Sequence, residues 1–277
     1  MKPLMIVHKI INLLDKNLSF RIFIKSYEWS STRKKGEILV TQKGLGLLSP
    51  ILVRAGTSDL DVFRQTFIGH SYRALLEYAE KHNAVFLKKN KLAILDCGSN
   101  IGLSALFFIS AFRGRDLEIC CVEADPENYA LNVKNTAPYP FVKVLHRAVW
   151  DSSEGLILNQ DFRDHKHWSR NVSEANNNAP AIANAITVEG ITLQELIEQF
   201  STRHIDILKI DIEGAEVQLF ESDSIDDILK NVESIAIEIH DEFDCRQMIC
   251  DRLSKNNFRW TQAGELTIGI KNHQKIS

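Results

Sequence analysis

Five short apolar segments recur along the chain from about residue 92 onward, separated by stretches of mixed polarity. Each is continuous and rich in Ile, Val and Leu, a pattern typical of parallel strands buried on both faces. The predicted strands are LAILDC (92–97), LEICCVEA (117–124), VKVLHRAVW (142–150), IDILKIDI (205–212) and VESIAIEIH (232–240). Two more segments, FRWTQ and ELTIGIK, flank Ala263-Gly264 and predict a C-terminal antiparallel hairpin.

Helix start signals lie between these strands. Asp125-Pro126 combines an N-cap residue with a first-turn proline and predicts a helix to about Thr136. The pairs Thr192/Glu195 and Ser224/Asp227 have the spacing of capping boxes, and another helix is expected across about 244–256. Alternating strands and helices imply right-handed crossovers, so we expect a doubly wound α/β domain over residues 92–277.

The first 91 residues do not alternate in this way. They predict a few short strands, a helix opened by a capping box at Ser58 and Asp61, and a helix over about 71–82. We therefore expect residues 1–91 to form an α+β lead-in, a cap segment packed on the core. The polar span 151–190 is predicted to be irregular, and loops of that length are usually functional or disordered.

Composition and charge narrow the class of protein. The chain is 44% hydrophobic and 25% charged, as in ordinary soluble proteins, and its net charge of −3 gives no reason to expect a nucleic-acid partner. Residues 1–91 nevertheless carry 16 Lys and Arg against 7 Asp and Glu. Two faces of one domain explain this asymmetry, and weak peripheral membrane contact through the basic N-terminal segment is the alternative.

Cysteines and the N-terminus bear on the compartment. The five cysteines form no CxxC pair, which favours free thiols in a reducing compartment and hence a cytoplasmic protein. The opening MKPLMIVHKIINLLDK is too short and too interrupted by charge to predict a signal peptide or a membrane span.

Acidic residues stand at or just after the carboxyl end of every one of the five predicted strands. Ligands of open α/β sheets bind at these ends, near the point where the strand order reverses. Caps and solvated strand ends would account for one or two such acids, but not for all five. The acids are Asp96, Glu123, Asp151, the pair Asp211 and Glu213, and Glu238, which is followed two positions later by His240.

The turn after the first strand, ILDCGSNIGLS (94–104), indicates which ligand binds there. Asn100 stands where a dinucleotide fingerprint has its middle glycine, the position at which backbone approaches a pyrophosphate. The carboxylate of Asp96 would repel phosphates but attract an ammonium or a sulfonium. Glu123 is placed to accept hydrogen bonds from both ribose hydroxyls. The pattern predicts S-adenosylmethionine, with an NAD-dependent oxidoreductase and a catalytically silent cofactor-binding module as alternatives.

Three longer motifs resemble those of the FkbM-type S-adenosylmethionine-dependent methyltransferases. ILDCGSNIGLSA is similar to their first motif, VEADPENYALNVKN to their second and LKIDIEGAEVQLFES to their most characteristic one. The resemblance covers residues 50–270 and implies a class I, Rossmann-like fold with a mostly parallel seven-stranded sheet. It also implies a methyltransferase acting on a hydroxyl of a sugar, a glycan or another small natural product. Residues 1–49 and 155–190 match none of these motifs, and we expect them to govern substrate choice.

Carried over residue by residue, the resemblance implies a cofactor site and a catalytic group. The cofactor residues are Asp96, Gly98, Asn100 and Gly102 at the methionine end and the turn, Glu123 at the ribose, and Asp125, Asn128 and Asp151 at the adenosine side. A hydroxyl acceptor needs a proton acceptor, for which the candidates are Asp211, Glu213 and His240. Asp125 is equally explained as a helix cap, and His240 as a histidine bonded to backbone. No metal site is predicted, because no third oxygen ligand joins Asp211 and Glu213.

Overall fold

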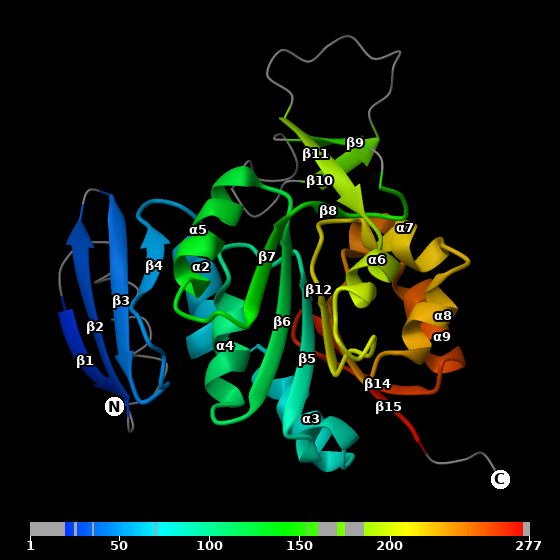
Figure 1. Cartoon of the computed structure of the whole chain (residues 1–277), viewed down its shortest axis with the longest axis horizontal. Coiled ribbons are helices and arrows are strands. Elements are labelled where there is room, and N and C mark those ends of the chain that lie inside the picture. Colours follow the sequence, from blue (N-terminus) through cyan, green and yellow to red (C-terminus); the bar gives the residue numbers. More distant parts are fainter. Residues whose placement is uncertain are drawn as a thin grey trace.

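A seven-stranded sheet forms the centre of the computed structural model, which describes residues 20–24, 27–34, 36–69, 71–153, 155–159, 171–174 and 186–273 (Figure 1). The strand order is β14-β15-β13-β12-β5-β6-β7, and β15 alone among these seven strands runs antiparallel to its neighbours. The strands are β5 (Lys91–Cys97), β6 (Asp116–Glu123), β7 (Val142–His146), β12 (Ile207–Ile210), β13 (Ser234–Glu238), β14 (Phe258–Ala263) and β15 (Leu266–Lys271). The predicted doubly wound sheet with its C-terminal hairpin is confirmed.

Helices cover both faces of this sheet, which explains why the strand sequences are continuously apolar. Neighbouring residues of one strand, such as Ile94 and Leu95 of β5, belong to two separate hydrophobic clusters on opposite faces. One face is covered by α4 (Leu103–Ala111) and α5 (Pro126–Thr136), and α3 (Arg73–Lys81) packs against the same cluster. The other face carries α6 (Leu193–Glu198), α7 (Glu216–Glu221), α8 (Ile225–Lys230) and α9 (Arg246–Lys255).

Two of the four predicted helix caps form. The Asp125 side chain accepts hydrogen bonds from the first turn of α5, and Thr192 with Glu195 makes a complete capping box on α6. Ser58 and Ser224 make no side-chain cap, so both of these predicted boxes are wrong. Each serine has a helical backbone, with φ −68° at Ser58 and −74° at Ser224, whereas a capping residue needs an extended one.

The predicted third strand, 142–150, is in fact two strands of different sheets. β7 ends at His146, which is paired with the last residue of β6, and Ala148–Val149 then forms β8 beside β11 (Ile186–Ile191). The span 151–190 is also less irregular than expected. It contains β9 (Gly155–Asn159) and β10 (Asn171–Glu174), which with β8 and β11 make a four-stranded sheet of order β10-β9-β11-β8.

The N-terminal part is the expected mixture of strands and helices. Strands β1 (Phe20–Ile24), β2 (Tyr27–Lys34), β3 (Glu37–Lys43) and β4 (Ile51–Arg54) form an antiparallel sheet. They are followed by α2 (Asp59–Phe63), a π-helical turn η1 (Arg64–Ile68), α3 (Arg73–Lys81) and η2 (Val85–Lys88). The Asn135 side chain of α5 pairs with both the main-chain N–H and the carbonyl of Leu52, and so joins β4 to the core. The boundary between residues 91 and 92 stays a prediction.

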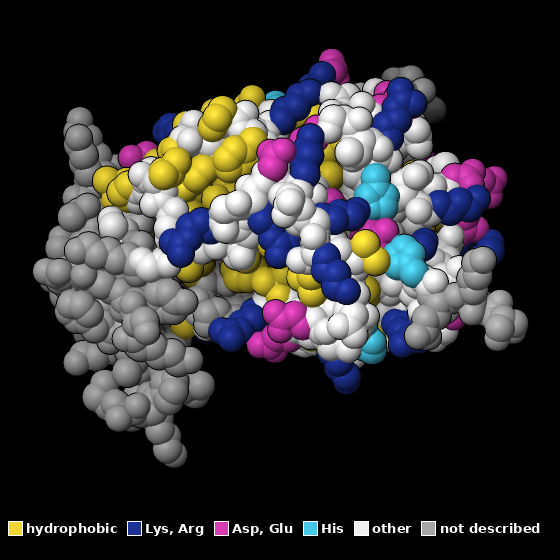
Figure 2. Space-filling view, turned by 60° about the horizontal axis from the view of Figure 1, so that its bottom comes forward, with side chains coloured by type: hydrophobic (Ala, Val, Ile, Leu, Met, Phe, Trp, Pro, Cys, Tyr) yellow, Lys and Arg dark blue, Asp and Glu magenta, His cyan; other side chains and the backbone are white. Residues whose placement is uncertain are grey.

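The surface of the described residues has mixed charge. Lys and Arg side chains are spread among acids over the face shown in Figure 2 rather than gathered in one patch. Within the described ranges, no helix combines the length and apolar character that crossing a bilayer requires. Of the basic N-terminal segment, for which weak membrane contact stays an expectation, residues 1–19 lie outside those ranges. All five cysteines are buried free thiols, as their spacing predicted.

Candidate active site

A cavity of about 980 Å³ opens at the carboxyl ends of the central strands. β5 lies between β6 and β12, so the strand order reverses at this point, where open α/β sheets bind their ligands. The wall is built from the residues that follow β5, β6, β12 and β13, together with η1, the start of α3 and the turn between β14 and β15. Its volume is at the upper end of the range for small-molecule sites, enough for a cofactor and an acceptor side by side.

The backbone amides of the turn after β5 donate hydrogen bonds within the protein. The N–H groups of Gly98 and Ser99 both donate to the carbonyl of Val122, and that of Gly102 donates to Ser99. The N–H of Ile101 donates to the Asn100 side chain. Because these amides are bonded within the protein, the turn does not offer the row of backbone donors by which dinucleotide loops hold a pyrophosphate.

The two glycines of this turn are required by packing. Gly98 has φ +71°, and a Cβ atom there would lie 1.7 Å from the carbonyl oxygen of Asp211. It therefore allows the ends of β5 and β12 to approach each other. Gly102 has φ +84° and packs against Asn132 of α5, outside the cavity wall. Between them, Asn100 has φ +48°, a conformation that asparagine tolerates better than most residues.

Glu123 forms the wall at the end of β6. Its Oε2 atom accepts from the N–H of Asn100 at 2.7 Å, and its Oε1 atom accepts from the N–H of Asp125 at 2.9 Å. Burial raises the pKa of Glu123 to about 7, against the opposing effect of the Asn100 hydrogen bond. The carboxylate is thus fixed in place at the cavity, in the position where the sequence predicts a ribose.

Asp96 does not line the cavity, although it was expected to contact the cofactor. It is fully buried behind the wall, hydrogen-bonded to the Ser104 hydroxyl, and its Oδ1 atom lies 3.3 Å from Nζ of Lys209. Lys209 also donates to the carbonyl of Gly98 and lies 3.6 Å from Oδ2 of Asp211. These two acids raise the pKa of Lys209 above its usual value despite burial. Asp96 therefore acts on the site through a buried cation.

The adenosine-side residues divide into two groups. Asp125 and Asn128 line the cavity, and Asn128 accepts a hydrogen bond at 2.6 Å from Arg54 of β4. Asp151 is exposed and is not part of the wall, because the strand that should have carried it to the sheet edge ends at His146. Ala148 and Val149 of β8 occupy the corresponding stretch of wall instead.

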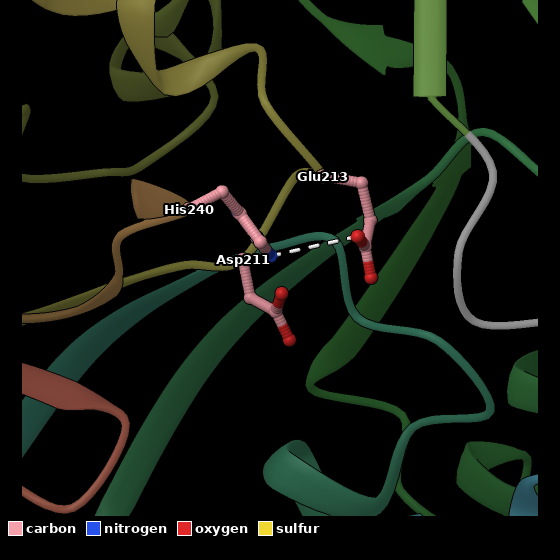
Figure 3. Close-up of side chains that lie close together, drawn as sticks. All are labelled: Asp211, Glu213 and His240. Carbon is pink, nitrogen blue, oxygen red and sulfur yellow. Dashed lines mark ion pairs between the residues drawn. The ribbon is translucent and has the colours of Figure 1, made fainter. Parts of the chain in front are cut away.

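The three candidate bases lie together at the ends of β12 and β13 (Figure 3). One side-chain ligand atom from each of Asp211, Glu213 and His240 lies within 4.8 Å of the other two. Asp211 and Glu213 line the cavity, whereas His240 is buried behind them, 3% exposed. Glu216 of α7 lies 2.9 Å from Nδ1 of His240 and 0% of it is exposed. Burial alone would lower the pKa of His240, but Glu216, Asp211 and Glu213 raise it to about 9.

Some wall residues were not predicted as site residues. Glu238, the last residue of β13, lines the cavity, and the negative charge of Asp211 together with burial raises its pKa to about 8. Its place at a strand end was a usable signal. Gln65, Thr66 and Tyr72, from η1 and the start of α3, form the opposite wall. Gln65 and Thr66 lie in the stretch LVRAGTSDLDVFRQTF (52–67), which resembles an upstream segment of the family, but a π-helical turn has no short motif that would single them out.

The sequence matches one protein-family model, and the fold is similar to several solved structures. A family model described as "Methyltransferase FkbM domain" matches residues 96–260. No curated protein matches the chain. Among solved structures, a methyltransferase FkbM from Methylobacillus flagellatus is similar at 14% identity and a TM-score of 0.44, over 65% of this chain and 44% of that one. A putative RNA methyltransferase from Pyrococcus horikoshii is similar at 12% identity and a TM-score of 0.39, over 75% of this chain and 84% of that one. The chain thus spans less than half of the Methylobacillus protein.

Proposed function

The chain belongs to the FkbM methyltransferase family, and from that premise we propose that it methylates a hydroxyl oxygen of a sugar, a glycan or another small natural product. S-adenosylmethionine is the methyl donor of this family. The observation that carries the proposal is the group of acids at the ends of β12 and β13, in the same cavity as Glu123. A hydroxyl is a poor nucleophile unless a neighbouring group accepts its proton, and these acids supply that group.

The cavity wall suits a positively charged, phosphate-free nucleoside. Its charged residues are two basic ones, Arg147 and Lys209, and six acids: Glu123, Asp125, Asp211, Glu213, Glu238 and Glu265. Such a surplus of negative charge favours a sulfonium and an ammonium over a pyrophosphate. We assign the ribose hydroxyls to Glu123, the methionine end to the Gly98–Asn100 turn and the adenosine side to Asp125 and Asn128. In this assignment Asp96 and Gly102 shape the turn from behind.

The protein's own part in the reaction is to align the acceptor and to take one proton. The cofactor supplies an already activated methyl group, so holding the hydroxyl in line can contribute about 7–11 kcal/mol. We assign proton acceptance to Asp211 and Glu238, which face the cavity, and the charge of Asp211 raises the pKa of Glu238. A pKa of about 8 at Glu238 places proton transfer near neutral pH. His240 is protonated at neutral pH in the metal-free protein, so we give it an orienting role.

The test separates cofactor binding from transfer. Calorimetry with S-adenosylhomocysteine measures the first, and incubation with labelled S-adenosylmethionine and a panel of sugars, glycans, polyols and amines measures the second. We expect S-adenosylhomocysteine to bind and an oxygen-methylated product to form. Asp211→Asn should keep cofactor binding and reduce transfer about 100-fold, the usual size of a lost general base. Methyl transfer to nitrogen with hydroxyl acceptors inert would overturn the proposed acceptor class.

A further inference from the structure

His240 has a ring nitrogen that the described part of the protein leaves unbonded. Its Nδ1 atom faces Glu216, and its Nε2 atom has no hydrogen-bond partner although the side chain is 97% buried. Nε2 is directed at the side chains of Asp211 and Glu213, with Oε2 of Glu213 3.5 Å away (Figure 3). Buried polar atoms nearly always have a hydrogen-bond partner, and this nitrogen has only the long ion-pair contact with Glu213, so the space between it and the two carboxylates can take a ligand.

Glu216, behind His240, is placed like the carboxylate that commonly hydrogen-bonds to a metal-bound histidine. Glu216 accepts from Nδ1 of His240, and the N–H groups of Ile212 and Gly214 hold its carboxylate in place. Metal-bound histidines commonly donate their second ring N–H to a carboxylate, which fixes the ring and makes the other nitrogen a better ligand. Because Glu216 is fully buried and does not face the cavity, this role explains its position.

We propose that Asp211, Glu213 and His240 bind one divalent cation at the wall of the cavity. Two carboxylate oxygens and one imidazole nitrogen balance the charge of such an ion and leave coordination positions for water or an acceptor oxygen. Donors at right angles around a small divalent ion lie about 3 Å apart, so the 3.5 Å between His240 and Glu213 needs only a small adjustment. Asp211, which is 31% exposed, has room to turn toward them.

The donor set also selects among cations. Imidazole nitrogen with carboxylates suits Mn²⁺ and Zn²⁺, whereas Mg²⁺ prefers oxygen ligands alone. The carboxylates of Asp211 and Glu213, grouped with His240 at the cavity wall, attract a divalent ion. The sequence places Asp211 and Glu213 close enough to share an ion but offers no third oxygen ligand, and only the fold brings the His240 nitrogen to them.

The position of the cation deepens the proposed function and rests on it. An ion bound to Asp211 would lie at the acceptor side of the cavity, where it lowers the pKa of a coordinated hydroxyl. Glu238, on the neighbouring strand end, would take the hydroxyl proton as the oxygen–methyl bond forms, while the sulfur–methyl bond of the donor breaks and neutral S-adenosylhomocysteine leaves. When the ion is bound, Asp211 is a ligand, and proton acceptance, which Asp211 and Glu238 share in the metal-free site, passes to Glu238 alone.

Direct binding of metal is the test. The full chain is treated with EDTA, exchanged into metal-free buffer and titrated with Mn²⁺, with loss of the free-ion electron paramagnetic resonance signal as the readout. Calorimetry with Zn²⁺ and with Mg²⁺ runs in parallel. We expect one equivalent of Mn²⁺ or Zn²⁺ and weaker Mg²⁺ binding. Asp211→Asn and Glu213→Gln should each weaken binding at least about tenfold, and Glu216→Gln about 10- to 100-fold.

Glu265→Gln is the matched control, because it removes one negative charge from the same wall outside the three ligands. Equal weakening by Glu265→Gln would mean diffuse attraction rather than coordination, and absence of saturable Mn²⁺ and Zn²⁺ binding would overturn the site. S-adenosylhomocysteine binding, measured on every variant, checks the fold. If the methyl acceptor proves to be an amine while the ion still binds, the proposed function fails and the metal site stands. If a hydroxyl is methylated and no ion binds, the proposed function stands and the metal site fails.

Discussion

The main-chain nitrogen of Asn100 lies 2.7 Å from Oε2 of Glu123, so the turn after β5 is tied to the carboxylate that ends β6. This contact uses the amide that stands where a dinucleotide fingerprint has its middle glycine. The same contact orients Glu123 toward the cavity. In our proposal, a replacement that looks like the loss of a phosphate site is part of a site for a phosphate-free nucleoside.

Cofactor affinity should increase as the pH rises through 7. Burial raises the pKa of Glu123 to about 7, so the carboxyl is protonated below that pH and accepts ribose hydroxyls poorly. If only the ionised form binds, affinity for S-adenosylhomocysteine gains about tenfold between pH 6 and pH 8. Calorimetry across this range measures it. Glu123→Gln should bind weakly without the pH dependence, whereas Glu265→Gln should keep it; a flat wild-type profile would contradict the assignment of Glu123.

Gly98 should tolerate no side chain. An alanine at this position would have to adopt a left-handed backbone, and its Cβ atom would collide with the carbonyl of Asp211. Gly98→Ala should therefore cost more than about 3 kcal/mol of unfolding free energy. Gly114 has a similar φ of +90° but open space around it, and Gly114→Ala should cost only about 1 kcal/mol. Chemical denaturation compares the two. Equal losses would mean that backbone strain, and not the contact between β5 and β12, is what requires glycine.

Two residues with the same sequence signal should differ in their effect on stability. Thr192 makes a capping box on α6, and Thr192→Ala should cost about 1 kcal/mol. Ser224 begins α8 without a side-chain cap, so Ser224→Ala should change the unfolding free energy by less than about 0.5 kcal/mol. Urea denaturation of both variants measures the difference. A loss at Ser224 as large as that at Thr192 would show that its cap forms in solution.

The buried carboxylate of Asp96 should destabilise the fold when Lys209 is removed. Lys209→Met leaves the fully buried carboxylate of Asp96 without its cation and should cost about 3–5 kcal/mol of unfolding free energy. Adding Asp96→Asn removes the uncompensated charge, so the double variant should be more stable than Lys209→Met alone. Strictly additive losses in the double-mutant cycle would mean that the two side chains do not interact.

Several features follow from the sequence because they depend on residues a few positions apart. The strands at 91–97, 116–123, 207–210 and 234–238 are continuous apolar runs, and such runs have few alternatives to burial between two layers of helices. The α5 cap needs only Asp125 and the two amides that follow its proline. The acids at strand ends are placed by the same logic, since parallel strands bring their carboxyl ends to one edge.

Other features were decided by contacts between distant segments. Whether 142–150 is one strand or two depends on where its partner strand ends, since β6 stops at Glu123 and β11 takes over the pairing. The serines at 58 and 224 match a capping motif, but the path of the chain into each helix gives them a helical backbone. His240 and Glu216 are 24 residues apart, and only the packing of α7 against β13 brings them together.

The sequence by itself therefore determined the order of strands and helices, the family and the kind of cofactor, because hydrophobic period, cap chemistry and strand-end charges are local properties. The tertiary structure decided which of those charges face the cavity. It buried Asp96 against Lys209, turned His240 toward Asp211 and Glu213, and brought η1 to the cavity wall. Side-chain direction and burial are set by the closest neighbours in space, and for these residues the neighbours come from segments far away in the chain.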